Sequence, residues 1–311
     1  MKLAMVFPGQ GSQSVGMLQA YTGLPAVTEV IAEARDVLGS EFVELLERGP
    51  AEALNLTLNT QPAMVTAGYA VFRAWRALGG PLPELVAGHS LGEYTALTAA
   101  GAIGFADCLP LVRFRAQAMQ EAVPEGQGAM AAILNLDDEG VKAACAEAAQ
   151  GETVQAVNFN APGQVVIAGH KAAVQRAMEA CKAKGAKRAL PLPVSAPFHS
   201  GLMQPAAERL REYLQRVELG SPAIPLINNV DVDSPADPAA IKDALVRQAA
   251  APVRWVETIQ RMSQSGVTHV LECGPGKILA GLVKRIAPGL QGIALSDRAA
   301  VEQALATIKG G

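Results

Sequence analysis

A serine flanked by two glycines is the first place where this sequence could perform covalent chemistry. The pentapeptide Gly88-His89-Ser90-Leu91-Gly92 follows the apolar run "ELVA" and precedes a helical pattern. A sharp strand-to-helix turn needs such small neighbours, lifts the hydroxyl above the sheet, and directs the next backbone N–H toward a developing oxyanion. Ser90 is therefore a candidate nucleophile for acyl transfer. A Gly-rich turn with an incidental serine stays open as the alternative.

The base that would activate this serine must be sought among four histidines. His89 adjoins the serine, so the turn directs it elsewhere. His170 opens a helical pattern, where a capping or surface role is expected, and His269 alternates with apolar residues in a buried strand. His199 lies in the Pro-rich segment "PLPVSAPFHSGLM", and catalytic groups concentrate in connecting segments on rigid scaffolds. We predict His199 as the base, and a packing role in that loop is the alternative.

One arginine lies on the apolar side of a helical pattern at residues 105–123. At about 100° per residue, the polar side chains gather on one face, which comprises Arg113, Gln117, Gln120 and Glu121. Arg115 falls on the opposite stripe. A guanidinium in apolar surroundings is unfavourable unless an acceptor meets it, and its planar fork suits a carboxylate. That carboxylate belongs either to an internal Asp or Glu or to a substrate.

The composition excludes several classes of protein. The chain has 311 residues, of which 50% are hydrophobic and 18% charged, so a large core is possible and disorder is not expected. A net charge of −3 provides no basic face for nucleic acid. There is no signal-peptide pattern, and the longest apolar run, at 96–106, is far shorter than a membrane span. The four cysteines form no CxxC pair, so we expect a reduced, cytoplasmic protein without a metal site.

The elements that must position these residues are short apolar strands alternating with helices. Buried strands are expected in "LAMVFPGQG", "ELVAGHS" and "VTHVLECGPG", each ending at a Gly-rich turn, with helical patterns between the first two up to about residue 80. This order predicts an α/β fold with a mainly parallel sheet. Ligands of such folds bind beyond the carboxyl ends of the strands, which is where all three turns lie.

Between about residues 126 and 196 the order changes to β-α-β-β-α-β, the ferredoxin-like plan. The segments are a strand in "GAMAAILNL", a helix in "DDEGVKAACAEAAQ", a hairpin in "TVQAVNFNAPGQVVIAG", a helix ending at Gly185 and a strand in "KRALPLPVS". We predict a main domain of residues 1–125 and 197–311 that carries an inserted subdomain of residues 126–196.

Several separated motifs resemble those of the malonyl-CoA:acyl carrier protein transacylases of fatty acid synthesis, a family related to the acyltransferase domains of polyketide synthases. Nearly the whole chain is covered, in the family order, by "FPGQGSQ" at 7–13, "NTQPA" at 59–63, "GHSLGEY" at 88–94, "NFNAPGQVVIAG" at 158–169, "PVSAPFHS" at 193–200, "DALVRQ" at 243–248 and "ECGPGK" at 272–277. The resemblance implies a hydrolase-like α/β domain with a ferredoxin-like insertion, in agreement with the order of elements above.

The resemblance also implies a reaction. Ser90 would take malonyl from malonyl-CoA, His199 would act as general base and then general acid, and Arg115 would bind the free carboxylate of the malonyl group. The second substrate would be the pantetheine thiol of an acyl carrier protein. Coenzyme A thioester and phosphopantetheine would both be substrates, so no cofactor is expected.

Three further residues would support this reaction by resemblance. The backbone N–H groups of Gln10 and Leu91 would form the oxyanion hole, and the backbone carbonyl of Gln248 would orient His199. The basic segment at 181–188, "CKAKGAKR", could meet an acidic carrier protein. A solvated helix end is the alternative reading of that segment.

Two other functions stay open at this point. An esterase or thioesterase would also use the serine motif, but it would need an acidic partner for the histidine and would give Arg115 no role. A non-catalytic carrier-binding module would use Ser90 only as part of a loop and would form no acyl-enzyme.

The short C-terminal tail leads us to expect a freestanding enzyme. The oligomeric state stays open, with a monomer as one option. The choice between fatty acid and polyketide synthesis also stays open.

Overall fold

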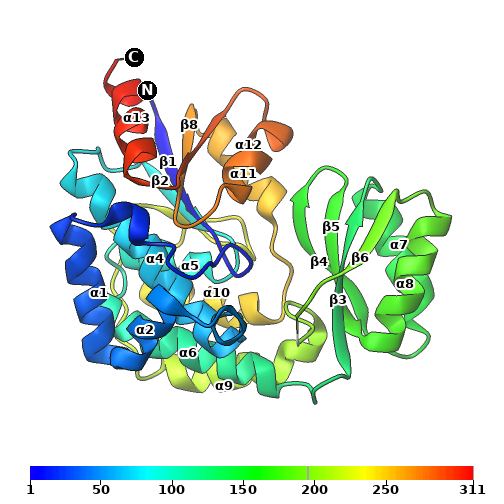
Figure 1. The fold of residues 1–311 in the computed structure, drawn as a ribbon. Coiled ribbons are helices and arrows are strands. Elements are labelled where there is room, and N and C mark those ends of the chain that lie inside the picture. The colour runs from blue at the N-terminus through cyan, green and yellow to red at the C-terminus, as the bar shows by residue number, and fades with distance from the viewer. Residues whose placement is uncertain (195, 311) are drawn as a thin grey trace.

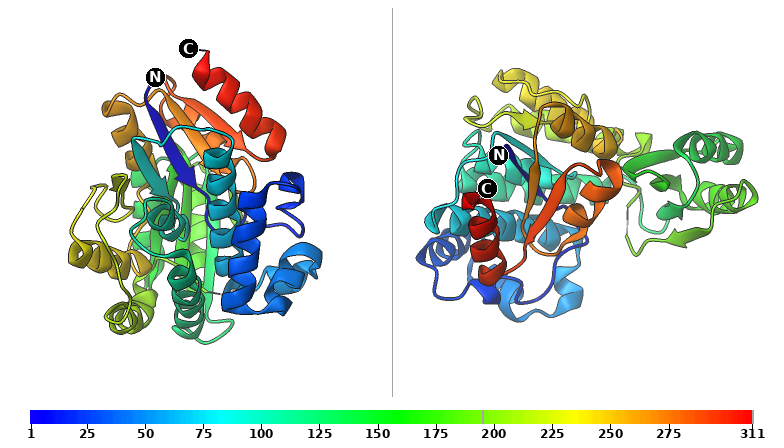
Figure 2. Two further views of the ribbon diagram at one scale, coloured as in Figure 1. Left: turned by 90° about the vertical axis from the view of Figure 1, so that its left-hand side faces the viewer. Right: turned by 90° about the horizontal axis from the view of Figure 1, so that it is seen from above.

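The chain folds into a larger body around a parallel sheet and a smaller body around an antiparallel sheet (Figure 1). The computed structural model describes residues 1–194 and 196–310. Ser195, which belongs to the motif "PVSAPFHS", and Gly311 lie outside the described residues. The smaller body projects from one side of the larger one (Figure 2). Within the described residues, no helix is long and apolar enough to cross a membrane.

The larger sheet holds five parallel strands in the order β7-β2-β1-β8-β9. The strands are β1 (Leu3–Phe7), β2 (Leu85–Gly88), β7 (Leu226–Ile227), β8 (His269–Cys273) and β9 (Gln291–Leu295). Parallel strands covered on both faces are apolar along their whole length, and every residue of β1 is buried. The predicted mainly parallel sheet is confirmed. Because β2, β1 and β8 are neighbours, their three Gly-rich turns meet at one edge.

Two strands of this sheet were not predicted. β7 is only two residues long, too short for any periodicity to indicate a strand. β9 lies at the edge of the sheet, and its first two residues, Gln291 and Gly292, are exposed. Neither strand therefore contains the continuous apolar run that marked the other three.

Side-chain alternation along β1 divides the core of the larger body into two layers. Leu3, Met5 and Phe7 pack in one cluster with α4, α5 and α6, whereas Ala4 and Val6 pack in another with α11 and α12. The helices of this body are α1 (Pro25–Leu38), α2 (Ser40–Arg48), α3 (Ala51–Leu54), α4 (Thr57–Ala77), α5 (Gly92–Ala99), α6 (Phe105–Glu121), α9 (Gln204–Leu214), α10 (Pro238–Ala249), α11 (Trp255–Gln264), α12 (Ile278–Ile286) and α13 (Arg298–Lys309), with 3₁₀ turns at Gln19–Tyr21 and Gly201–Met203.

The smaller body has the predicted β-α-β-β-α-β order. Its elements are β3 (Gly128–Leu134), α7 (Asp138–Ala149), β4 (Val154–Ala161), β5 (Gln164–His170), α8 (Lys171–Ala183) and β6 (Arg188–Pro191), and its sheet order is β4-β5-β3-β6. All of its strand pairs are antiparallel. Helix α8 ends at Ala183, two residues before the predicted stop at Gly185. The domain boundaries at 125/126 and 196/197 stay a prediction.

The two faces of the smaller sheet have different partners. One face packs against α7 and α8 in a single apolar cluster. Met130 and Val157, on the other face, belong to a cluster that includes Phe198 from the larger body. The segment after α10 also joins the edge strand β4, because the Val253 amide donates to the Val157 carbonyl at 2.8 Å and the Phe159 amide donates to the Val253 carbonyl at 3.0 Å. The smaller sheet is thus tied to the larger body close to the candidate nucleophile.

Candidate active site

The turn between β2 and α5 holds Ser90 in a conformation that few residues with a side chain adopt. Its φ is 51°, in the left-handed region, and such a conformation persists only where the surroundings impose it. Close packing requires both flanking glycines. A Cβ on Gly88 would lie 1.8 Å from the carbonyl carbon of Gly92, and one on Gly92 would lie 2.0 Å from the carbonyl oxygen of Phe7. The predicted sharp strand-to-helix turn is confirmed.

Asn229, which lies far from Ser90 in the sequence, forms two side-chain hydrogen bonds to the backbone of this turn. Asn229 Oδ1 accepts a hydrogen bond from the Ser90 amide at 2.8 Å, and Asn229 Nδ2 donates to the Gly88 carbonyl at 2.7 Å. Asn229 is fully buried and follows β7. The sequence reasoning missed this residue, and the available signal was a pair of asparagines directly after the short apolar stretch "IPLI".

The structure places the His199 ring against the Ser90 hydroxyl. Ser90 Oγ and His199 Nε2 are 2.7 Å apart, although 109 positions separate the residues in the sequence. His199 Nδ1 lies 2.9 Å from the backbone carbonyl oxygen of Gln248. Because a carbonyl can only accept, Nδ1 carries the ring proton and Nε2 is free to accept the hydroxyl proton.

The environment keeps this imidazole neutral. Burial and the nearby positive charge of Arg115 lower the pKa of His199 to about 3, against the opposing effect of the Gln248 carbonyl. The ring is therefore unprotonated at pH 7, which is the form a general base needs. The φ of His199 is 64°, so this residue, like Ser90, is held in the left-handed region. Its role as base stays a prediction.

Arg115 is buried on the apolar side of α6, as the periodicity predicted, with 2% of its surface exposed. Its Nη2 donates to Ser90 Oγ at 3.2 Å and to Gln248 Oε1 at 3.0 Å, and its Nη1 donates to Gln61 Oε1 at 2.9 Å. The guanidinium also lies 5.3 Å from the centre of the Tyr94 ring. Among the described residues, no Asp or Glu forms a salt bridge with Arg115, and its Nε has no hydrogen-bond partner.

These contacts are all with neutral groups, so the internal ion pair considered for Arg115 is not observed among the described residues. Gln61, which supplies one of the acceptors, was missed as a functional residue. It lies in α4 directly before Pro62 and is buried. An amide side chain among the mostly apolar buried residues of a long helix was the signal that could have identified it.

The predicted oxyanion donors lie on the turns after β1 and β2. Gln10 and Leu91 both line the cavity that contains Ser90. Among the described residues, no acceptor is found for the backbone N–H of either residue. The Gln10 side chain donates to Thr57 Oγ1 at 3.2 Å, which anchors its loop to α4. This geometry is compatible with an oxyanion hole, and the assignment stays a prediction.

The cavity around Ser90 lies between the two bodies. Its volume is about 130 Å³. Arg115, Ser90 and His199 line it from the larger body, and Met130 and Asn158 line it from the smaller sheet. The smaller body is therefore part of the wall that would surround an acyl group.

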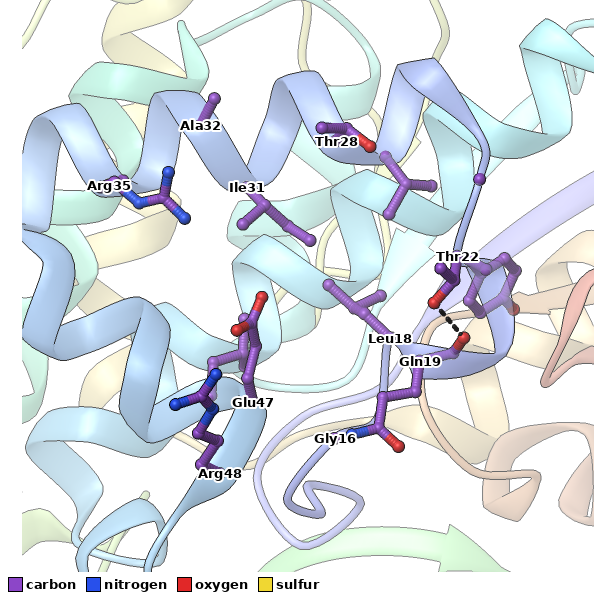
Figure 3. A pocket seen from close by; sticks show the side chains of 14 residues that line it. Gly16, Leu18, Gln19, Thr22, Thr28, Ile31, Ala32, Arg35, Glu47 and Arg48 are labelled. Carbon is purple, nitrogen blue, oxygen red and sulfur yellow. Dashed lines mark hydrogen bonds between the residues drawn. The ribbon is translucent and has the colours of Figure 1, made fainter.

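A second and larger cavity, of about 470 Å³, opens between α1, α2 and the segment before α1 (Figure 3). Arg35 and Arg48 stand on one side of it, and Thr22 donates to the Gln19 carbonyl at 2.6 Å on the other. Among the described residues that line it, there is no serine, histidine or cysteine. The nucleophile and its base therefore belong to the smaller cavity.

The three remaining histidines have structural partners. His89 Nε2 pairs with Asn160 Oδ1 at 2.7 Å, and its ring lies against Trp255, 5.4 Å between centres. His170 precedes α8, but its side chain does not cap that helix and instead accepts from the backbone amide of Thr153 at 2.9 Å. His269 is buried in β8, as predicted.

Within the described residues, no group of three or more His, Cys, Asp and Glu side chains could hold a metal ion. All four cysteines are buried and unpaired. In the basic segment at 181–188, Lys182 pairs with Glu179 and Lys184 with Glu147, each at 3.1 Å. These ion pairs reduce the positive charge that the segment can offer to a partner.

The arrangement has known counterparts. The model of the family described as acyl transferase domain matches residues 4–290. A malonyl CoA-acyl carrier protein transacylase of Salmonella typhimurium is 54% identical over 305 residues, which cover 98% of this chain and 99% of the relative. The transacylase of the same name from Bacillus subtilis is 46% identical, with 99% and 98% covered.

Solved structures agree over the same length. An acyl-carrier-protein S-malonyltransferase of Burkholderia pseudomallei superposes with a TM-score of 0.97 at 63% identity, covering 98% of this chain and 99% of that one. A malonyl transacylase solved in complex with a holo acyl carrier protein of a type II polyketide synthase gives a TM-score of 0.97 at 52% identity, covering 99% and 100%. The hydrolase-like α/β fold with a second, smaller sheet is therefore confirmed.

Proposed function

The chain belongs to the acyl transferase domain family, and from this membership we propose that it transfers a malonyl group from coenzyme A to the pantetheine thiol of an acyl carrier protein. One observation carries the proposal: Arg115 is buried 3.2 Å from the Ser90 hydroxyl oxygen without a carboxylate partner among the described residues. A malonyl group brings its own carboxylate, which the planar guanidinium can bind through two parallel hydrogen bonds. An acetyl group offers no such partner.

In the first half-reaction, His199 Nε2 takes the Ser90 hydroxyl proton as Oγ attacks the thioester carbonyl carbon. The carbonyl oxygen becomes an oxyanion, which the N–H groups of Gln10 and Leu91 bind. When the intermediate collapses, the carbon–sulfur bond breaks and the leaving sulfur takes the proton from His199. The products are free coenzyme A and malonyl-Ser90.

The second half-reaction reverses these roles. The carrier thiol gives its proton to His199 Nε2, and its sulfur attacks the carbonyl carbon of malonyl-Ser90. The carbon–oxygen bond to the enzyme breaks, and Ser90 Oγ regains its proton from His199. The malonyl thioester leaves on the carrier, and the enzyme returns to its starting state without any cofactor.

Substrate binding raises the basicity of the histidine. The charge of Arg115 is one cause of the low His199 pKa. A malonyl carboxylate paired with the guanidinium cancels much of this charge, so the pKa of His199 rises and the imidazolium forms more readily. A carbonyl partner such as that of Gln248 stabilises an imidazolium less than a carboxylate does. The weaker partner suffices here because a thiol is a better leaving group than an amine.

The two alternatives explain fewer of the observations. An esterase or thioesterase places a carboxylate next to the histidine, but the partner of His199 Nδ1 is a backbone carbonyl. It also leaves the buried Arg115 without a purpose. A non-catalytic module does not account for a neutral imidazole 2.7 Å from the serine hydroxyl.

The product of this reaction is an extender unit for fatty acid or polyketide synthesis. Its partners are malonyl-CoA and the acyl carrier protein, with no role for nucleic acid. A cytoplasmic location is part of the proposal and is supported by the four unpaired, buried cysteines, which fit a reducing compartment.

The test is the intact-protein mass after brief exposure to malonyl-CoA, followed by addition of carrier protein with its pantetheine thiol. We expect a malonyl adduct that requires Ser90, forms poorly from acetyl-CoA and passes to the carrier faster than it hydrolyses. Ser90→Ala is the control for the attachment point. An adduct lost to water at the same rate with or without carrier would indicate a thioesterase, and no adduct would return Ser90 to a structural turn.

A further inference from the structure

A carboxylate lies buried directly behind the nucleophile turn and has no part in the steps above. Glu93 lies in the first turn of α5, three residues after Ser90, with 1% of its surface exposed. Its Oε2 accepts hydrogen bonds from the Asn229 amide at 2.9 Å and from Gln248 Nε2 at 3.0 Å. It therefore contacts two residues that hold the site and does not contact Ser90 Oγ itself.

These contacts determine how the Gln248 side chain is oriented. Its Nε2 has two acceptors, Glu93 Oε2 and the Ser90 carbonyl oxygen, the latter at 2.9 Å. The Ser90 carbonyl can only accept, and Glu93 Oε2 also accepts from the Asn229 amide, so the NH₂ group faces these two oxygens and Oε1 faces the other way. On that other side lies Arg115 Nη2, at 3.0 Å from Oε1. The amide is thus a relay between a buried carboxylate and a buried guanidinium.

The orientation of the Gln248 amide determines whether an acceptor oxygen or an NH₂ donor faces the Arg115 guanidinium. With Oε1 toward the guanidinium, Gln248 is an acceptor that holds Nη2 beside Ser90 Oγ. With the amide reversed, two sets of N–H donors would face each other and the guanidinium would be displaced. The Ser90 carbonyl by itself would fix the orientation of the Gln248 amide less strongly than the carbonyl and the Glu93 carboxyl fix it together. The reason is that hydrogen bonds to charged or buried acceptors are stronger than other hydrogen bonds.

We propose that Glu93 is a positioning residue for acyl-group selectivity: through the Gln248 amide, it holds the Arg115 guanidinium where a malonyl carboxylate must bind. This inference rests on the proposed function, because it concerns the selectivity of that reaction. A purely structural Glu93 would support the first turn of α5 and would affect all acyl groups equally.

Other charged groups face Glu93 as well. Arg115 approaches from α6 and favours the ionised carboxyl, whereas Asp231, in the segment after β7, opposes it. The proposed role needs an acceptor oxygen and not a particular charge. A glutamine at this position keeps that oxygen, so Glu93→Gln is the conservative variant and Glu93→Ala the disruptive one.

A matched control is available in a neighbouring strand of the larger sheet. Glu272 in β8 is also fully buried, and its Oε2 accepts from the Ala280 amide of α12 at 2.8 Å. Its partners belong to α12 and not to the site around Ser90. Glu272→Ala therefore removes an equally buried carboxylate without touching Gln248 or Arg115.

The experiment measures the rates of serine acylation by malonyl-CoA and by acetyl-CoA in quenched single-turnover reactions, and takes their ratio. For Glu93→Ala we expect the ratio to fall on the order of tenfold, as for the loss of a hydrogen bond to a charged group. For Glu93→Gln and Glu272→Ala we expect it to stay within about threefold of wild type. A folded Glu93→Ala protein with the wild-type ratio would overturn the proposal.

A second variant tests the relay itself. Gln248→Met removes the side-chain amide but keeps the backbone carbonyl that His199 uses, and we expect the same fall in the ratio. If the residues act in series, the double variant Glu93→Ala with Gln248→Met falls no further than Gln248→Met alone. Additive losses, each as large as in the single variants, would contradict the relay.

The proposal can still be tested if the Glu93→Ala variant does not fold. If Glu93→Ala does not fold, Glu93→Met refills the space without an acceptor and takes its place. An unchanged ratio in Gln248→Met, or in any folded Glu93 variant that lacks an acceptor, counts against the proposal. The proposed function fails separately, because in that case wild-type protein itself forms no malonyl adduct.

Discussion

Two Gly-rich turns at the same edge of the larger sheet invite comparison. Residues 88–92 connect β2 to α5, residues 273–277 connect β8 to α12, and both strands flank β1. Each turn also has a fully buried glutamate beside it, Glu93 in the first case and Glu272 in the second. By sequence pattern and burial the two are much alike. Ser90 of the first turn lies beside the His199 ring, whereas the thiol of Cys273 in the second turn is buried and donates to the Gly68 carbonyl.

The difference lies in what each glutamate contacts. Burial raises the pKa of Glu93 to about 7 and also raises the pKa of Glu272. Glu93 then joins residues from the segment after β7 and from α10, and so reaches Arg115. Among the described residues, Glu272 accepts hydrogen bonds only from backbone amides in the first turn of α12. A buried, perturbed carboxyl therefore marks a functional region only when its partners lead to reacting atoms.

We expect the largest difference in acylation rate between substitutions of two histidines: His199, which contacts Ser90 in the first turn, and His269, in the strand before the second turn. His199→Ala removes the base of the first turn, and we expect serine acylation to fall about 10²–10⁴-fold. His269→Ala alters the strand that leads to the second turn and should leave acylation unchanged. The measurement is the initial rate of malonyl adduct formation, with near-ultraviolet circular dichroism to verify folding. Equal losses in both variants would mean that stability, and not the base, was changed.

A smaller effect should follow from substitution of Arg115, which contacts Ser90 in the first turn. Arg115→Ala should lower malonyl loading on the order of a hundredfold, because a bidentate charged pair with the substrate is lost. Acetyl loading should change much less. Arg115→Lys keeps the charge but not the fork and should fall between wild type and Arg115→Ala. If Arg115→Ala retained its preference for malonyl over acetyl, the carboxylate-binding role would be refuted.

The second turn should respond in stability and not in catalysis. Glu272→Ala leaves the amides at the start of α12 without their acceptor, so we expect the free energy of unfolding to fall by about 1–2 kcal/mol. Malonyl loading of the folded protein should be unchanged. Urea unfolding and single-turnover loading on the same preparation provide the check. If Glu272→Ala selectively lowered malonyl loading, Glu272 would also act on the reaction, and the proposed difference between the two turns would be wrong.

The smallest effect concerns Glu93 and pH. The pKa of Glu93 is about 7 in the folded protein against an ordinary value of 4.5, so ionisation of this carboxyl destabilises the folded state. The destabilisation is absent below about pH 4.5, grows as the pH rises, and reaches its full size above about pH 7. Glu93→Gln removes this penalty while keeping an acceptor. We expect it to raise the free energy of unfolding by roughly 1 kcal/mol or more at pH 8, with no gain at pH 4. An equal change at both pH values would show that titration of Glu93 is not the cause.

Much of the candidate site could be predicted because it is encoded in neighbouring residues. The small residues around Ser90 indicated the turn, and the periodicity of residues 105–123 placed Arg115 on the buried face of α6, where the structure has it. Alternation of apolar strands and helices indicated the parallel sheet, and the changed order after residue 126 indicated the smaller body. These features depend on interactions within a few residues of each other, which a linear pattern records.

The rest was decided by packing between distant segments. Nothing local to His199 indicates that its ring meets a serine 109 positions earlier, and local reasoning had only its loop context to favour it. Gln61 and Glu93 lie within the motifs "NTQPA" and "GHSLGEY", but neither these motifs nor the residues around Asn229 indicate a partner. The three residues became part of the site because α4, α5 and the segment after β7 converge on one edge of the sheet. A buried polar side chain must find its partner in whichever element packs beside it. The sequence alone therefore determined the nucleophile turn and the face on which the arginine lies, and only the tertiary structure decided which groups activate, hold and orient them.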